Sequence, residues 1–148
     1  MSDRLNRLFS EYGQSPWLDN LKRSYITSGE LDRVRASGIR GLTSNPTIFQ
    51  KAIQGSDDYT EQFKSLISSN SSTLDSYWAL VLQDIQGALD VFAPLYESSG
   101  CLDGFVSVEV DPNLANKGDQ TLIAARQLDE RVNRDNVMIK IPATAEGI

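Results

Sequence analysis

Short apolar runs alternate along this chain with longer stretches in which apolar residues recur every three or four positions. The short runs predict four strands, at 15–19, 39–43, 104–110 and 137–142. The longer stretches predict a short helix over 5–12 and further helices before each later strand. Strands that alternate with helices are typical of a parallel sheet with right-handed crossovers. The chain is therefore predicted to be α/β, with one extra helix at its N-terminus.

Several helix ends carry recognisable signals. Thr27 is a candidate N-cap with a glutamate three residues later, and Asn45 is a candidate N-cap that Pro46 follows at the first helical position. Asp119 is expected to cap the helix before the last strand. Pro94 is expected to end or kink the long helix that begins near Tyr77.

Each predicted strand carries a polar group at or near its carboxyl end. In chain order these groups are Asp19, Thr43 with Asn45, Glu109, and Lys140. The carboxyl ends of parallel strands meet at one edge of a sheet, where α/β barrels and open α/β sheets place their chemistry. Agreement on four strands is not expected by chance. The set indicates an amine nucleophile with carboxylates for proton transfer.

Each of these residues also has a purely structural interpretation. Lys140 lies in an apolar run and could be a lysine that blunts an exposed sheet edge. Glu109 could be only the ion-pair partner of that lysine. Asn45 could be only a helix cap, and Asp19 could cap a turn. The residues alone leave these alternatives open.

Composition narrows the chemistry further. The 148 residues contain no histidine, so general acid–base work falls to Asp, Glu, Lys or Tyr. Cys101 is the single cysteine, which leaves no disulfide framework or zinc cluster. A net charge of −6 without a basic run argues against nucleic-acid binding, and no stretch approaches the ~20 apolar residues of a membrane span. One domain in a reducing cytoplasm is expected.

Two segments then resemble the signatures of the transaldolase family. They read GLTSNPTIF (41–49) and VMIKIPAT (137–144), and the second resembles the segment that holds the Schiff-base lysine. The segments WLDN (17–20) and SVEVD (107–111) resemble the family's first and third strands. The likeness runs from about Gln14 onward. It is strongest to the longer bacterial subfamily, in which the transaldolase part can be fused to a sugar-phosphate isomerase domain.

The resemblance implies a (β/α)₈ barrel enzyme of the pentose phosphate pathway that uses neither metal nor cofactor. Such an enzyme moves a dihydroxyacetone unit from sedoheptulose 7-phosphate to glyceraldehyde 3-phosphate, giving erythrose 4-phosphate and fructose 6-phosphate. By position, Lys140 matches the imine-forming residue, Asp19 the base for the C4 hydroxyl, and Glu109 the acid–base partner that acts through water. Asn45 matches a residue that orients the dihydroxyacetone moiety, with Thr43 beside it. Amine attack requires an unprotonated lysine, and we expect the apolar strand around Lys140 to keep that amine dry.

A barrel of this kind needs about 250 residues. The sequence is therefore expected to be the N-terminal half of one transaldolase-type domain over 1–148, with the first four strands. Its open strand edges favour self-association, and we expect little or no turnover by this polypeptide alone. Two alternatives stay open: a non-catalytic, self-associating fragment, and an aldolase that releases free dihydroxyacetone.

Overall fold

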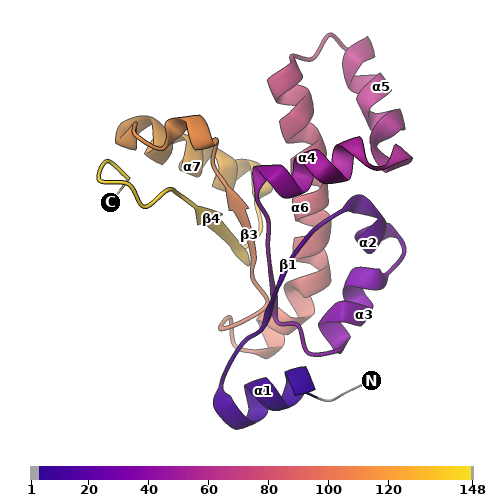
Figure 1. The fold of residues 1–148 in the computed structure, drawn as a ribbon, viewed down its shortest axis with the longest axis vertical. Coiled ribbons are helices and arrows are strands. Elements are labelled where there is room, and N and C mark those ends of the chain that lie inside the picture. Colours follow the sequence, from indigo (N-terminus) through magenta and orange to yellow (C-terminus); the bar gives the residue numbers. More distant parts are fainter. Residues whose placement is uncertain (1–3, 148) are drawn as a thin grey trace.

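A four-stranded parallel sheet organises the computed structural model, which describes residues 4–147 (Figure 1). The strands are β1 (Trp17–Asp19), β2 (Gly41–Thr43), β3 (Val106–Glu109) and β4 (Val137–Lys140). They lie side by side in chain order, and every neighbouring pair is parallel. A doubly wound sheet would reverse this order at a switch point, whereas a (β/α)₈ barrel keeps it. The predicted fold class, a part of such a barrel, is therefore confirmed.

The helices lie between the strands, with one before the first. The α-helices are α1 (Arg4–Tyr12), α2 (Arg23–Thr27), α3 (Glu30–Ala36), α4 (Pro46–Gln54), α5 (Thr60–Ser68), α6 (Thr73–Ser98) and α7 (Gly118–Val132). Two short 3₁₀ turns, η1 (Asp57–Tyr59) and η2 (Pro112–Leu114), complete the elements within residues 4–147.

One face of the sheet builds the hydrophobic core. Val106 and Val108 of β3 and Val110, the residue that follows this strand, alternate along the chain and are each at most 3% exposed. Helix α6 packs on β3 and α7 packs on β4, so these valines meet the apolar stripe of α6. The residues between the valines point to the other face. Because the valines face the helices, the polar residues between them lie on the face that would line the interior of a barrel.

The predicted N-cap at Thr27 is wrong. Thr27 is the last residue of α2, a helix that the sequence pattern did not predict, and its Oγ1 donates to the Arg23 carbonyl at 3.3 Å. The next helix, α3, begins after Gly29, whose φ of +70° is left-handed. A glycine adopts that conformation without steric cost, so the chain can break one helix and start another there.

The predicted cap at Asp119 is replaced by another residue, and of the two effects predicted for Pro94 the structure excludes helix termination. The cap position of α7 is Lys117, and Asp119 lies inside the first turn, so the predicted cap at Asp119 is wrong. An acidic side chain there still interacts favourably with the helix dipole. Pro94 does not end α6, which continues to Ser98. The apolar residues Phe63 and Ile67 of α5 are 46% and 57% exposed.

Polar contacts tie the amino ends of the strands together, opposite the carboxyl ends. The Arg40 guanidinium pairs with the buried Asp103 carboxylate, which also accepts a hydrogen bond from Ser15 Oγ at 2.7 Å. The same guanidinium lies 3.4 Å from the centre of the Phe9 ring, which fastens α1 to this end of the sheet (Figure 1). In barrels, contacts at this end serve stability.

A buried charged network joins α2, η1 and α6. Arg23 Nε donates to Asp84 Oδ1 and Tyr59 Oη donates to Asp84 Oδ2, both at 2.8 Å. Asp84 is 1% exposed and Arg23 is 7% exposed. Burial raises the pKa of Asp84, while the hydrogen bonds from Arg23 and Tyr59 oppose that rise. Each charge is therefore tolerated in the interior because the other is present.

Asp84→Ala is expected to lower the free energy of unfolding by about 3–5 kcal/mol, because it leaves a buried guanidinium without its counter-charge. The double variant Arg23→Met/Asp84→Leu removes both charges and is expected to recover much of that loss. Urea unfolding followed by circular dichroism measures both values.

The matched control is Asp90→Ala on the same helix, which breaks the exposed pair between Asp90 and Arg134 Nε (2.8 Å). An exposed pair contributes about 0–1 kcal/mol. A loss in Asp84→Ala no larger than in this control would contradict the proposed role of the buried network.

Candidate active site

The sheet register brings the carboxyl ends of the strands to one edge. Glu109 lies opposite Lys140 in the β3–β4 pair, and Asp19 lies opposite Thr43 in the β1–β2 pair. Thr43 in turn lies opposite Ser107 of β3. The polar groups predicted from the sequence therefore share one end of the sheet.

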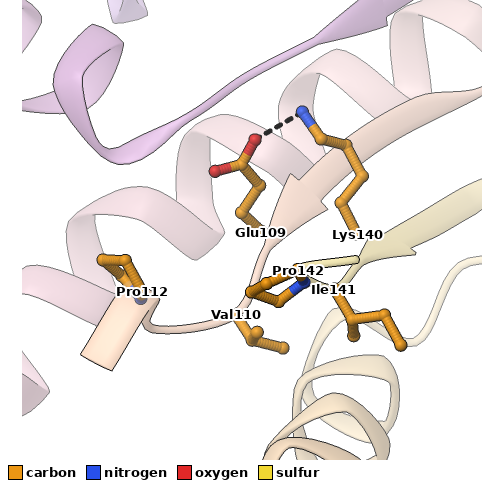
Figure 2. A pocket seen from close by; sticks show the side chains of 6 residues that line it. All are labelled: Glu109, Val110, Pro112, Lys140, Ile141 and Pro142. Atoms are coloured by element: carbon orange, nitrogen blue, oxygen red, sulfur yellow. Dashed lines mark ion pairs between the residues drawn. The ribbon is translucent and has the colours of Figure 1, made fainter. Parts of the chain in front are cut away.

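Lys140 makes three polar contacts across the face of the sheet. Its Nζ lies 2.5 Å from Glu109 Oε1 in an ion pair (Figure 2), and it donates to Thr43 Oγ1 at 3.0 Å and to the Ser44 carbonyl at 3.4 Å. Those last two acceptors belong to the end of β2, two strands away. The amine is therefore directed across the sheet toward β3 and β2, an orientation that its placement on an outer strand does not by itself require.

The amine is less dry than the sequence predicts. The Lys140 side chain is 40% exposed and that of Glu109 is 31% exposed. Met138, on the same face of β4, is 41% exposed. The residues directly before and after Lys140, Ile139 and Ile141, lie on the opposite face of the strand, so they do not exclude water from the amine.

Glu109 stands between two hollows. One, of about 230 Å³, is lined by Glu109, Lys140 and the apolar residues around them (Figure 2). The other, of about 480 Å³, is lined by Asp19, Asn45 and Glu109, with Lys51 of α4 also at its wall. Glu109 therefore lines the hollow that Lys140 also lines as well as the hollow that Asp19 lines.

Asp19 and Asn45 differ in how much the fold itself uses them. Asn45 Oδ1 accepts from the Ile48 backbone N–H at 3.0 Å and caps α4, as predicted. The side chain of Asp19 is exposed and makes no hydrogen bond or ion pair with the residues from 4 to 147. The interpretation of Asp19 as a turn cap is therefore wrong, and its carboxylate is available to a ligand in the larger hollow.

Sequence reasoning missed three residues near this site. Ser107 Oγ donates to Thr43 Oγ1 at 3.0 Å, and Ser44 Oγ donates to the Ser107 carbonyl at 2.8 Å. Tyr77 of α6 lines a smaller hollow of about 130 Å³ beside Glu109. Burial raises the pKa of Tyr77, and the charges of Asp111 and Glu109 raise it further, so the phenol keeps its proton at neutral pH. Of these three residues, only Ser107 could have been identified from the sequence, because strand alternation places it on the same face as Glu109.

An aromatic ring covers the sheet face toward the amino ends of the strands. The Trp17 indole lies against Gly41, where any Cβ would overlap the ring. Glycine is required there because the side chain of Trp17 occupies the space. Thr43 lies two residues further along the same strand face, so the polar cluster begins where the indole ends.

Within residues 4–147, no three potential Asp, Glu or Cys ligands gather into a metal-binding group. In the same range, every helix is too short or too polar to cross a bilayer.

Comparison with known proteins identifies the family to which this chain belongs. The family model described as "Transaldolase/Fructose-6-phosphate aldolase" matches residues 16–148. A protein named "Transaldolase" from Trichodesmium erythraeum is 44% identical over 137 residues, 92% of this chain and 36% of that protein. "Transaldolase 2" from Nostoc punctiforme is 45% identical over 139 residues, 93% of this chain and 36% of that protein.

A "Transaldolase" from Frankia alni is 43% identical over 149 aligned positions, 100% of this chain and 40% of that protein. The sheet order and the parallel pairing are those of part of a (β/α)₈ barrel. The chain belongs to the transaldolase/fructose-6-phosphate aldolase family. It spans 36% to 40% of the length of these curated relatives.

Asn45→Ala is expected to lower the free energy of unfolding by about 1 kcal/mol, because the Ile48 N–H loses its cap. Asn45→Asp keeps a capping oxygen and is expected to retain most of the stability. Thermal unfolding of both variants measures the difference. Equal stability of Asn45→Ala and the unaltered chain would show that the cap contributes nothing.

Proposed function

We propose that this chain supplies the amine and the proton-transfer groups of a transaldolase. The reaction moves a dihydroxyacetone unit from sedoheptulose 7-phosphate to glyceraldehyde 3-phosphate, in the pentose phosphate pathway. The observation that carries the proposal is the contact of 2.5 Å between Lys140 Nζ and Glu109 Oε1, at the edge that Asp19 and Asn45 also reach. Family membership supports the same chemistry.

The first step is attack of Lys140 Nζ on the C2 carbonyl of the donor. The ammonium must first lose a proton, and Glu109 is the nearest base. Glu109 can then return a proton, directly or through water, to the hydroxyl of the carbinolamine, so that water leaves and an iminium remains. The partial exposure of both side chains leaves room for that water.

The second step is cleavage of the C3–C4 bond. A base removes the proton of the C4 hydroxyl while the bonding electrons move into the iminium, and erythrose 4-phosphate leaves. Asp19 suits this role because it makes no competing hydrogen bond within the described chain. The remaining enamine attacks the aldehyde of glyceraldehyde 3-phosphate, the proton returns, and hydrolysis releases fructose 6-phosphate.

Asn45 and Thr43 are proposed to orient the three-carbon unit. Asn45 uses its carbonyl oxygen for the helix cap, so its amide NH₂ is left to donate to a sugar hydroxyl. Thr43 contacts Lys140 Nζ directly and therefore adjoins the atoms that react.

A second candidate is an aldolase that uses the same imine and releases free dihydroxyacetone. The family model covers both activities by its description. The two differ in whether the enamine requires an aldehyde acceptor or is protonated and hydrolysed.

Borohydride in the presence of fructose 6-phosphate is expected to leave a reduced sugar adduct on Lys140 of the 148-residue chain. Peptide mass spectrometry locates the adduct. Lys140→Ala is expected to abolish it, because the nitrogen that forms the imine is gone. Release of free dihydroxyacetone from fructose 6-phosphate without an acceptor would favour the aldolase candidate.

The control is Lys64→Ala, which removes an exposed lysine of α5 that pairs with Glu61 outside the site. It is expected to keep the adduct at full yield. If no adduct forms on Lys140 of the unaltered chain, the transaldolase proposal fails and the non-catalytic alternative is favoured.

We also propose that copies of the chain associate through the edges of the sheet. Strands β1 and β4 are the outer strands of the described sheet, and Met138 and Ile141 at β4 are 41% and 48% exposed. Unpaired backbone groups beside apolar side chains favour pairing with another strand.

Ile141→Lys is therefore expected to reduce concentration-dependent association, measured by sedimentation velocity. The control, Leu122→Lys, changes an equally exposed apolar residue on α7, away from the edge. Association that responds equally to both substitutions, or a chain that stays monomeric at every concentration, would contradict pairing at this edge.

A further inference from the structure

Ser107 is a buried residue that hydrogen bonds join to the end of β2, beside Lys140. It lies in β3, is 2% exposed, and makes two bonds to the end of β2. Its hydroxyl donates to Thr43 Oγ1 at 3.0 Å, and its carbonyl accepts from Ser44 Oγ at 2.8 Å. Thr43 and Ser44 are the two residues of β2 and its end that accept from Lys140 Nζ. Ser107 therefore holds both acceptors without touching the amine itself.

The two hydrogen bonds that Thr43 Oγ1 accepts determine where its own hydroxyl proton can point. A hydroxyl oxygen has two acceptor positions and one proton. Thr43 Oγ1 accepts from Ser107 Oγ and from Lys140 Nζ, which uses both acceptor positions. The proton of Thr43 must point away from both donors, and it meets no acceptor within residues 4–147. Thr43 therefore meets a ligand as a donor.

We propose that Ser107 is a positioning residue that acts on Lys140 through Thr43. By donating to Thr43 Oγ1, Ser107 fixes the Thr43 hydroxyl so that it accepts from the Lys140 ammonium and directs its own proton toward a ligand oxygen. The part about the ligand rests on the transaldolase proposal. The part about the amine does not, because every contact in it lies within the chain.

A serine whose side chain only packs between the two strands would behave differently. Its loss would loosen β2 and β3 whether or not Thr43 carried a hydroxyl. A serine that acts through Thr43 loses its effect on Lys140 once the Thr43 hydroxyl is absent. A double-mutant cycle separates these two roles because only the second gives non-additive effects.

The test is reductive methylation of the 148-residue chain with formaldehyde and cyanoborohydride, with the rate at Lys140 divided by the rate at Lys64 in the same digest. Formaldehyde forms an imine with an unprotonated amine and the hydride reduces it, so the rate reports how strongly the ammonium is held. Thr43→Val removes one acceptor and is expected to speed methylation of Lys140 about fivefold, the equivalent of one hydrogen bond. Ser107→Ala is expected to speed it about threefold.

The decisive measurement is the methylation rate of Lys140 in the double variant Ser107→Ala/Thr43→Val. This rate is expected to equal the rate in Thr43→Val alone. Ser107→Cys keeps the size of the side chain with a weaker donor, and it is expected to change the rate in the same direction by less. Ser76→Ala deletes another buried serine, 4% exposed on α6, and is expected to leave the ratio unchanged. Unchanged rates in both Ser107 variants, or equal added effects in the two backgrounds, would overturn the proposal.

Trapping of the fructose 6-phosphate adduct completes the test. Ser107→Ala is expected to slow trapping about fivefold although it speeds methylation, because Thr43 no longer directs its proton to the sugar. No adduct in the unaltered chain, together with a non-additive methylation cycle, would remove the proposed function and leave the positioning role of Ser107 intact. Faster trapping in Ser107→Ala would overturn the assigned direction of the Thr43 proton.

Discussion

The parallel register of the four strands is the constraint on which the site depends. Side chains alternate along a strand, so the valines of β3 can face the helices only if Ser107 and Glu109 face the other way. A slip of one residue would send Glu109 into the core and a valine toward Lys140. Burial of the valines therefore selects the register that pairs Glu109 with Lys140. The core and the site are two consequences of the same alternation.

Three polar contacts hold the amine of Lys140 in place on the face of the sheet. Glu109, Thr43 and the Ser44 carbonyl stabilise the ammonium, which positions the nitrogen in the absence of a ligand. In the proposed mechanism, the contact to Glu109 is also the route by which the proton leaves. Both side chains are partly exposed, so the described part of the chain provides that proposal with geometry and a base rather than a dry pocket.

The ion pairs that support the fold lie away from the carboxyl edge of the sheet, where the candidate site lies. The Arg23–Asp84 pair lies among the helices, and the Arg40–Asp103 pair lies at the amino ends of the strands. In each pair the carboxylate is buried, with its guanidinium buried (Arg23) or half-buried (Arg40) beside it. The carboxylate of Asp19, by contrast, is exposed at the carboxyl edge and makes no hydrogen bond within residues 4–147. The unpaired carboxylate of Asp19 therefore lies at the edge where barrels place their ligands, whereas these two pairs lie elsewhere in the fold.

The sequence by itself determined the four strands, their parallel direction and the edge that carries Lys140, because these follow from local periodicity and from connection rules. The barrel-like order of the strands was implied only by the family resemblance. The Asn45 cap was equally local. The break at Gly29 and the cap at Lys117 were not, since competing local signals differ by less free energy than tertiary packing contributes. Only the tertiary structure decided that Arg23 pairs with Asp84, 61 residues away, and that Ser107 bonds to Thr43. Such contacts depend on side-chain directions across neighbouring elements, and periodicity along one chain segment contains no information about them.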